Sequence, residues 1–99
     1  MVIVVWEFQV KAGKNEEFEK HYGANGTWAE FFRRDATYRG TQLVRDLSDA
    51  QRYATMDTWE DEEAYGAFRA VNRQEYAALD QEMEALTESE KRVGIFAQL

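Results

Sequence analysis

The 99-residue sequence predicts an α+β sandwich of the ferredoxin-like type, with one four-stranded antiparallel sheet that carries helices on one face. The order of hydrophobic patterns indicates this fold, because it runs strand, helix, strand, strand, helix, strand. The first strand is apolar on both faces at its start, so both faces of the sheet need cover. A second copy of the chain is the simplest cover for the face without helices. We therefore expect one domain, residues 1–99, that forms a homodimer.

The first third of the chain supplies one strand and a broken helix. Residues 2–10 alternate between the two faces, as a strand does. Asn15 is expected to cap a helix that runs through Tyr22, and the two glycines of residues 23–26 interrupt that helix. Residues 27–30, Thr-Trp-Ala-Glu, match a capping box, so a second helix is expected to start at the tryptophan.

The rest of the chain supplies three strands and a long helical region. Residues 38–47 and 51–59 are predicted to form a hairpin, because β-formers flank a short polar turn. The segment 61–86 has helical periodicity, with acidic residues near its start where the helix dipole favours them. The phase of its apolar face slips at residues 71–73, which predicts a bend or two helices. Residues 93–98 are expected to form a short last strand.

Composition argues against several classes of function. The net charge of −7 disfavours nucleic-acid binding, which needs clustered lysine and arginine. No apolar run is long enough to span a membrane, and residues 1–5 lack the basic leader of a signal peptide, so we expect a cytoplasmic protein. The absence of cysteine rules out a thiol nucleophile. One histidine and the acidic run 60–63 make no ligand set, so we expect neither metal nor cofactor.

Several segments of the chain follow one another in an order and spacing that are typical of one family. They are Val4-Val-Trp-Glu-Phe-Gln-Val10 with Gly13, Phe18-Glu-Lys-His-Tyr-Gly23, Gly26-Thr-Trp-Ala29, Tyr38-Arg-Gly-Thr-Gln-Leu43, Tyr53-Ala-Thr-Met-Asp-Thr-Trp59 and Phe68. Together they cover nearly the whole chain. The chain resembles the antibiotic biosynthesis monooxygenase domain, within the dimeric α/β-barrel superfamily.

The resemblance implies the fold described above, dimers with sheets face to face, and a pocket between sheet and helices in each subunit. Some members oxygenate aromatic polyketides or quinols without flavin, metal or haem, whereas others degrade haem. Haem-degrading members pair an asparagine on the first strand with a histidine on the helix after the third strand. Here Trp6 or Glu7 occupies the first position and that helix has no histidine. Haem degradation therefore has no specific support.

Three residues are candidates for catalysis. By resemblance, Trp59 matches a pocket tryptophan at the end of the third strand, and Tyr65 matches a pocket tyrosine on the next helix. The alternatives are that Trp59 belongs to the core and that Tyr65 lies on the helix surface. His21, the only histidine, is a candidate general base or an ordinary surface residue. An amide that oxygenase members can have four residues before the tryptophan is replaced by Thr55.

Aromatic residues from the first strand and the broken helix are expected to wall the pocket. The predicted pocket residues are Trp6, Tyr22, Trp28, Phe32, Thr55, Asp57 and Phe68. Asp57 and Arg45, on adjacent strands, are expected to form a buried ion pair or a substrate clamp. Glu7 and Gln9 are expected to face the cavity between the two subunits.

Two classes of function are consistent with this pattern. The first is a cofactor-independent monooxygenase that acts on an aromatic or quinol-type small molecule. An electron-rich phenolate can itself give an electron to oxygen, so the protein has to desolvate and orient it and handle a proton. The second is a non-catalytic dimeric binding or accessory protein. An enzyme should direct polar groups into the aromatic pocket, whereas a structural protein should fill that space with side chains.

Overall fold

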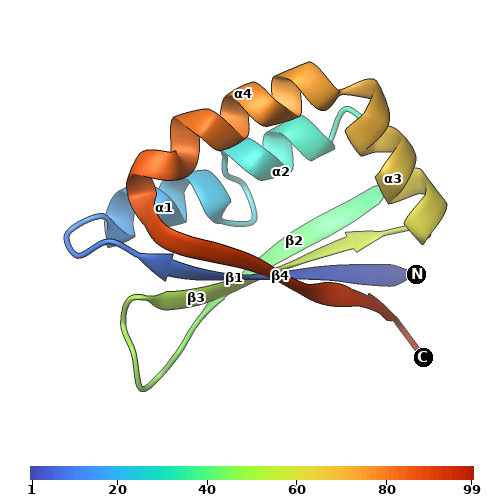
Figure 1. Ribbon diagram of the computed structural model, residues 1–99. Helices are drawn as coiled ribbons and strands as arrows, with labels where there is room; N and C mark the ends of the chain where they lie inside the picture. Colours follow the sequence, from blue (N-terminus) through green and yellow to red (C-terminus); the bar gives the residue numbers. More distant parts are fainter.

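The chain folds into a four-stranded antiparallel sheet with all helices on one face (Figure 1). The structure is a computed structural model that describes residues 1–99. The strand order β2-β3-β1-β4 is that of the ferredoxin-like fold, so the predicted fold class is confirmed. The elements are β1 (Val2–Val10), α1 (Asn15–Tyr22), α2 (Thr27–Phe32), β2 (Tyr38–Arg45), β3 (Arg52–Trp59), α3 (Glu62–Val71), α4 (Arg73–Met83), the 3-10 turn η1 (Glu84–Leu86) and β4 (Thr87–Ala97).

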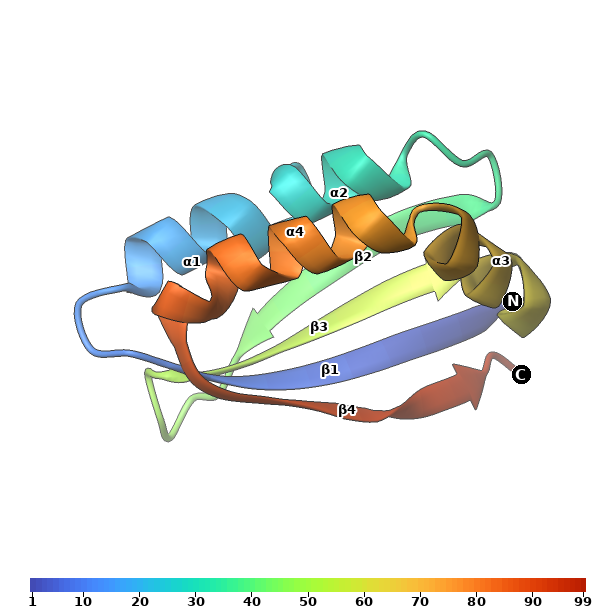
Figure 2. The same cartoon turned by 45° about the horizontal axis from the view of Figure 1, so that its top comes forward.

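The helices form one layer above the sheet, and the opposite face of the sheet is open (Figure 2). Even-numbered residues of β1 and odd-numbered residues of β3 face the helices, since Val4 pairs with Asp57 and Phe8 pairs with Tyr53. A cluster of sixteen buried apolar and aromatic residues fills the space between the two layers. Phe18 and Tyr22 stack at its centre with ring centroids 4.2 Å apart. Burial of these rings is the main source of stability.

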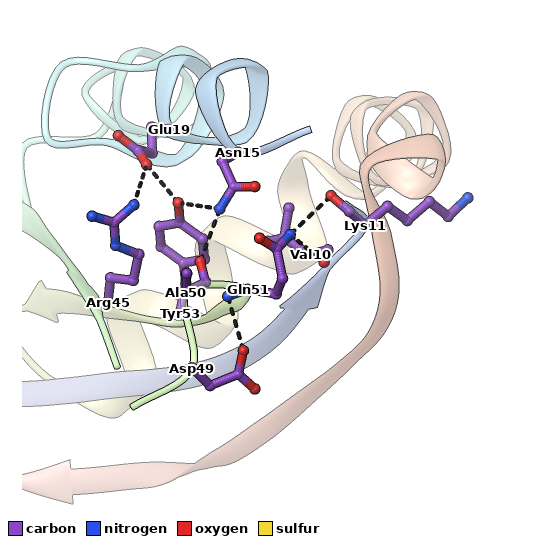
Figure 3. Close-up of polar contacts among 9 residues, drawn as sticks. All are labelled: Val10, Lys11, Asn15, Glu19, Arg45, Asp49, Ala50, Gln51 and Tyr53. Carbon is purple, nitrogen blue, oxygen red and sulfur yellow. Dashed lines mark hydrogen bonds and ion pairs between the residues drawn. The ribbon is translucent and has the colours of Figure 1, made fainter. Parts of the chain in front are cut away.

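The predicted helix caps of α1 and α2 are wrong, because both side chains make tertiary contacts. Asn15 is the first helical residue, and its amide donates to the Ala50 carbonyl (2.8 Å) and the Tyr53 hydroxyl (3.0 Å) (Figure 3). Gly26 precedes α2, and the Thr27 hydroxyl is hydrogen-bonded to a histidine of α1. A Cβ on Gly26 would lie 2.6 Å from backbone carbonyl oxygens of α1, so only glycine allows this close approach.

The bend in the long helical region is confirmed. Asn72 separates α3 from α4 at the predicted position. Asp61 caps α3, because its Oδ1 accepts from the Ala64 amide at 2.8 Å. β4 begins at Thr87, six residues before the predicted start of the last strand. The sequence Thr-Glu-Ser-Glu-Lys-Arg has no apolar alternation, as is common for an exposed edge strand.

The open face of the sheet carries several apolar side chains. Its apolar side chains include Ile3, Val5, Val44, Met56 and Phe96. Leu43 and Ile95 pack against the helix-side core, and Leu47 is fully exposed after β2. The register of β4 shifts between Val5 and Trp6, which alternation alone does not reveal. Phe96 remains about half exposed, so an apolar surface does lie open.

None of the helices is long and apolar enough to cross a membrane.

Candidate functional site

An aromatic cavity of about 70 Å³ lies between the sheet and the helix layer. The structure places six of the predicted pocket residues in its wall: Trp6, Tyr22, Trp28, Phe32, Thr55 and Asp57. Residues that the sequence did not single out complete the wall: Phe8, Thr41, Arg69, Tyr76, Asp80 and Glu90. The wall therefore combines stacked aromatic surface with several polar groups, which suits a small amphipathic ligand.

Asp57 is a buried carboxylate without a cation. It is 7% exposed, and its Oδ1 accepts one hydrogen bond from the Thr41 hydroxyl at 2.6 Å. The same hydroxyl is hydrogen-bonded to the Tyr38 phenol, so a chain of hydroxyl groups leads away from the carboxylate. Burial raises the pKa of Asp57 to about 6, although the Thr41 hydrogen bond acts in the opposite direction. A carboxyl with this pKa exchanges a proton near neutral pH.

The predicted pair between Asp57 and Arg45 is wrong. The register of β2 on β3 places Thr41 opposite Asp57 and Arg45 opposite Tyr53. Arg45 forms an ion pair with Glu19 at 3.6 Å instead, beside the Tyr53 ring (Figure 3). Its charge is therefore neutralised outside the cavity.

The part of the wall contributed by α3, α4 and β4 is polar. The Arg69 guanidinium lies 4.5 Å from the centre of the Tyr76 ring, a cation–π contact. Burial and the negative charge of Asp80 raise the pKa of Glu90 to about 7. Burial also raises the pKa values of Tyr22 and Tyr76, so both phenols stay neutral at physiological pH.

Two indole N–H groups are buried without an acceptor in the protein. One belongs to Trp28, which lines the cavity, so this wall contains a donor with no partner. The other belongs to Trp59, which is fully buried outside the cavity wall. The centroid of its ring lies 5.2–5.6 Å from the ring centroids of Phe32, Tyr38, Tyr65 and Phe68.

The three predicted catalytic residues lie outside the cavity wall. Tyr65 packs on Trp59, and its hydroxyl is 3.4 Å from Nη1 of Arg69. His21 shares a hydrogen bond of 2.7 Å with Thr27 and thereby ties α1 to α2. Phe68, predicted as a pocket residue, is core beside Trp59. The catalytic roles of these residues stay predictions from the resemblance.

Sequence reasoning missed Thr41, Arg69, Asp80 and Glu90 for two reasons. Thr41 was recognisable only from the register of β2 on β3, which a bulge near Gly40 shifts. Glu90 belongs to the part of β4 that the pattern did not reveal, and it reaches the cavity because it pairs with Phe8. No group of three histidine, cysteine or acidic side chains is arranged to hold a metal ion.

Fold and site together define a class of small α+β proteins with an aromatic cavity between the sheet and the helices. The sequence model of one family, described as antibiotic biosynthesis monooxygenase, matches residues 1–78. The chain belongs to the antibiotic biosynthesis monooxygenase family.

Solved structures share the fold at low sequence identity. SnoaB from Streptomyces nogalater, described as a cofactor-independent oxygenase, superimposes with a TM-score of 0.78 at 24% identity, covering 99% of this chain and 92% of that chain. A putative antibiotic biosynthesis monooxygenase from Deinococcus radiodurans gives a TM-score of 0.75 at 15% identity, covering 100% of this chain and 93% of that chain. An uncharacterized NIPSNAP domain protein from Burkholderia xenovorans gives a TM-score of 0.73 at 18% identity, covering 100% of this chain and 95% of that chain. No curated protein sequence matches this chain significantly.

Proposed function

We propose that this protein is a cofactor-independent monooxygenase that oxidises a small, single-ring phenol or quinol in the aromatic cavity. The observation that carries the proposal is the buried Asp57 carboxylate in an aromatic wall, with no cation beside it. A general base needs a pKa near the working pH and access to the substrate proton. Asp57, with a pKa of about 6, meets both conditions. Family membership and the fold shared with SnoaB support the reaction class.

The cavity favours a small substrate. Its volume of about 70 Å³ equals the liquid volume of about two water molecules. Small movements of Tyr76 and Arg69, which are both partly exposed, would make room for one aromatic ring. Trp6 and Trp28, which both line the cavity, would flank such a ring. A fused polycyclic substrate would need a much larger opening.

The chemistry divides between the substrate and Asp57. Asp57 accepts the phenolic proton, and the phenolate transfers an electron to O₂. The two radicals combine into a carbon–oxygen bond, and the resulting peroxide takes the proton from Asp57. Asp57 then removes the proton from the oxygenated carbon; the carbonyl forms as the O–O bond breaks, and the expelled hydroxide takes that proton from Asp57 and leaves as water. One oxygen atom enters the substrate, and its two lost hydrogens leave in the water. The protein contributes desolvation, orientation and this proton transfer.

Oxygen consumption with the purified protein tests the proposal. The probes are monocyclic quinols and phenols, with anthrone as a larger comparison. Asp57→Asn is expected to lower turnover by at least about a hundredfold, because it removes the base and keeps the shape. The matched control is Asp49→Asn in the β2–β3 turn, far from the cavity, which should retain turnover within about twofold. Full turnover by Asp57→Asn would overturn the role of Asp57.

A binding or accessory role is the second candidate, and the small volume of the cavity favours it. Side chains occupy most of the aromatic space, as expected for a protein that performs no chemistry. Saturable binding of a phenol, seen as quenching of tryptophan fluorescence, without any oxygen consumption would support this alternative over the monooxygenase.

A further inference from the structure

The eight arginines of the chain divide sharply by their partners. Five of them form ion pairs with carboxylates: Arg33, Arg34, Arg39, Arg45 and Arg52. The remaining three, Arg69, Arg73 and Arg92, have no carboxylate within ion-pair distance, and all three line the same groove. This arrangement stands out in a chain with nineteen acidic residues and a net charge of −7.

The groove lies between α3 and the edge strand β4 and has a volume of about 490 Å³. Arg69 is on α3, Arg73 is the first residue of α4, and Arg92 is on β4. Two consecutive helices and the last strand thus contribute one guanidinium each. The wall contains a single acidic residue, Glu62, which forms no ion pair.

The electrostatics of the groove favour an anion. Three like charges that share one concave wall repel one another, and the protein supplies no acceptor that neutralises them. Guanidinium groups present forked donors that match the oxygens of phosphate and carboxylate groups. A concave basic surface on an acidic protein also concentrates anions locally, since the surrounding negative surface repels them elsewhere.

We propose that this groove binds a small-molecule anion that carries two or more negative charges on phosphate or carboxylate groups. The groove is open to solvent and its wall carries three guanidinium groups, so it offers partners for more than one anionic group. The site is distinct from the cavity of the proposed reaction, although Arg69 belongs to both walls. Binding at the groove does not depend on that reaction.

Gly66 offers a way to block the groove without disturbing the core. It is exposed on α3 in the groove wall, and a Cβ at this position would meet no atom within 4 Å. A glutamate there would place a carboxylate among the guanidinium groups. An alanine adds only a methyl group and favours the helix.

Calorimetric titration at constant ionic strength tests the site, with pyrophosphate and citrate as probes and sodium chloride as the reference. We expect saturable binding of at least one probe, and the stronger of the two identifies the preferred anionic group. The double variant Arg73→Gln/Arg92→Gln should weaken this binding at least tenfold. The control Arg34→Gln/Arg39→Gln removes two positive charges outside the groove and should change the affinity for the probe less than twofold.

The glycine variants give an independent readout. Gly66→Glu should abolish binding, whereas Gly66→Ala should retain it, with circular dichroism showing that both fold. Absence of saturable binding for both probes would overturn the proposal. Equal loss in the two double variants would overturn it too, because it would indicate non-specific attraction to positive charge.

Discussion

Asp57 illustrates how one buried residue links stability to chemistry. Its pKa rises from 3.8 to about 6 on folding, because burial disfavours the ionised form. Below pH 3.8 the carboxyl is protonated in both states and carries no penalty. As the pH rises from 3.8 to about 6, the unfolded chain ionises while the folded carboxyl stays protonated, so stability falls; above 6 both states are ionised and the cost is constant. The cost at high pH is on the order of 3 kcal/mol.

The first prediction follows from this loss of stability at high pH. Asp57→Asn should raise the free energy of unfolding at pH 8 by up to about 3 kcal/mol and leave it nearly unchanged at pH 4. Urea denaturation at the two pH values measures the difference. An equal effect at both would show that Asp57 titrates normally in the folded protein.

The second prediction concerns the rate. If Asp57 is the base, it must be ionised to accept a proton, so kcat/KM should rise with pH through an apparent pKa near 6. The rise should be absent from the residual activity of Asp57→Asn. A profile with its inflection far from 6, or one that Asp57→Asn preserves, would assign the proton transfer to another group.

The third prediction tests the role that the resemblance gives to Tyr65. Its hydroxyl contacts Arg69 and lies outside the cavity wall, so Tyr65→Phe should cost about 1 kcal/mol of stability or less and change turnover less than about threefold. His21→Ala should likewise leave turnover nearly unchanged, since His21 contacts Thr27. A loss of ten- to a thousandfold in either variant would support the catalytic role predicted from sequence.

At the scale of elements, hydrophobic periodicity predicted those features that depend on which side chains pack into the core. The faces of β1 and the bend at Asn72 follow from apolar spacing, and the structure has both. Features set by partners far away in sequence were not predictable. Asn15 and Thr27 match helix caps locally, but tertiary hydrogen bonds occupy their side chains. The first half of β4 carries no pattern because its side chains meet mostly water.

The same limit applies to the candidate site. Aromatic spacing indicated most of the apolar wall. The polar wall depends on strand register, which shifts near Gly40 in β2 and at two places where β4 pairs with β1, next to Val5 and next to Val10. Adjacent strands made a pair between Arg45 and Asp57 plausible, yet Asp57 lies opposite Thr41 and Arg45 lies opposite Tyr53, four residue pairs along the ladder. Register is a property of the assembled sheet, so local spacing does not define it.

The fourth prediction concerns the contact between α1 and the β2–β3 hairpin. Asn15 donates to Ala50 and Tyr53 and holds the start of α1 against the hairpin (Figure 3). Asn15→Ala should lower the free energy of unfolding by about 1–3 kcal/mol, because two hydrogen bonds are lost and the Tyr53 hydroxyl loses a donor. Glu16→Ala, exposed in the same helical turn, should change it by less than about 0.5 kcal/mol. Thermal or urea unfolding distinguishes the two.

At the scale of the whole molecule, the open face of the sheet is the main unpartnered surface. It presents Val44 and Phe96, both at least 41% exposed, beside Ile3 and Val5. An exposed apolar patch of this kind is typical of an interface. We propose a homodimer formed through this face.

The fifth prediction tests the dimer. Light scattering at micromolar concentration should give a mass of twice 11.6 kDa. Val5→Glu should give the monomer mass, because it would bury an unpaired charge. Ser89→Glu, on the same face but at its exposed edge strand, should remain dimeric. A wild-type mass of one chain would contradict the proposal.

Arg69 lines both the aromatic cavity and the groove that contains Arg73 and Arg92, so ligands at the two proposed sites would meet the same guanidinium and their binding would be coupled. A ligand in either site biases the orientation of one guanidinium that the other ligand also meets. By linkage, whatever factor an anion imposes on the affinity for a phenol, the phenol must impose on the affinity for the anion. Two titrations in opposite order should therefore return the same factor. The concentration of a charged metabolite would then regulate occupancy of the cavity, through one side chain and without any rearrangement of the fold.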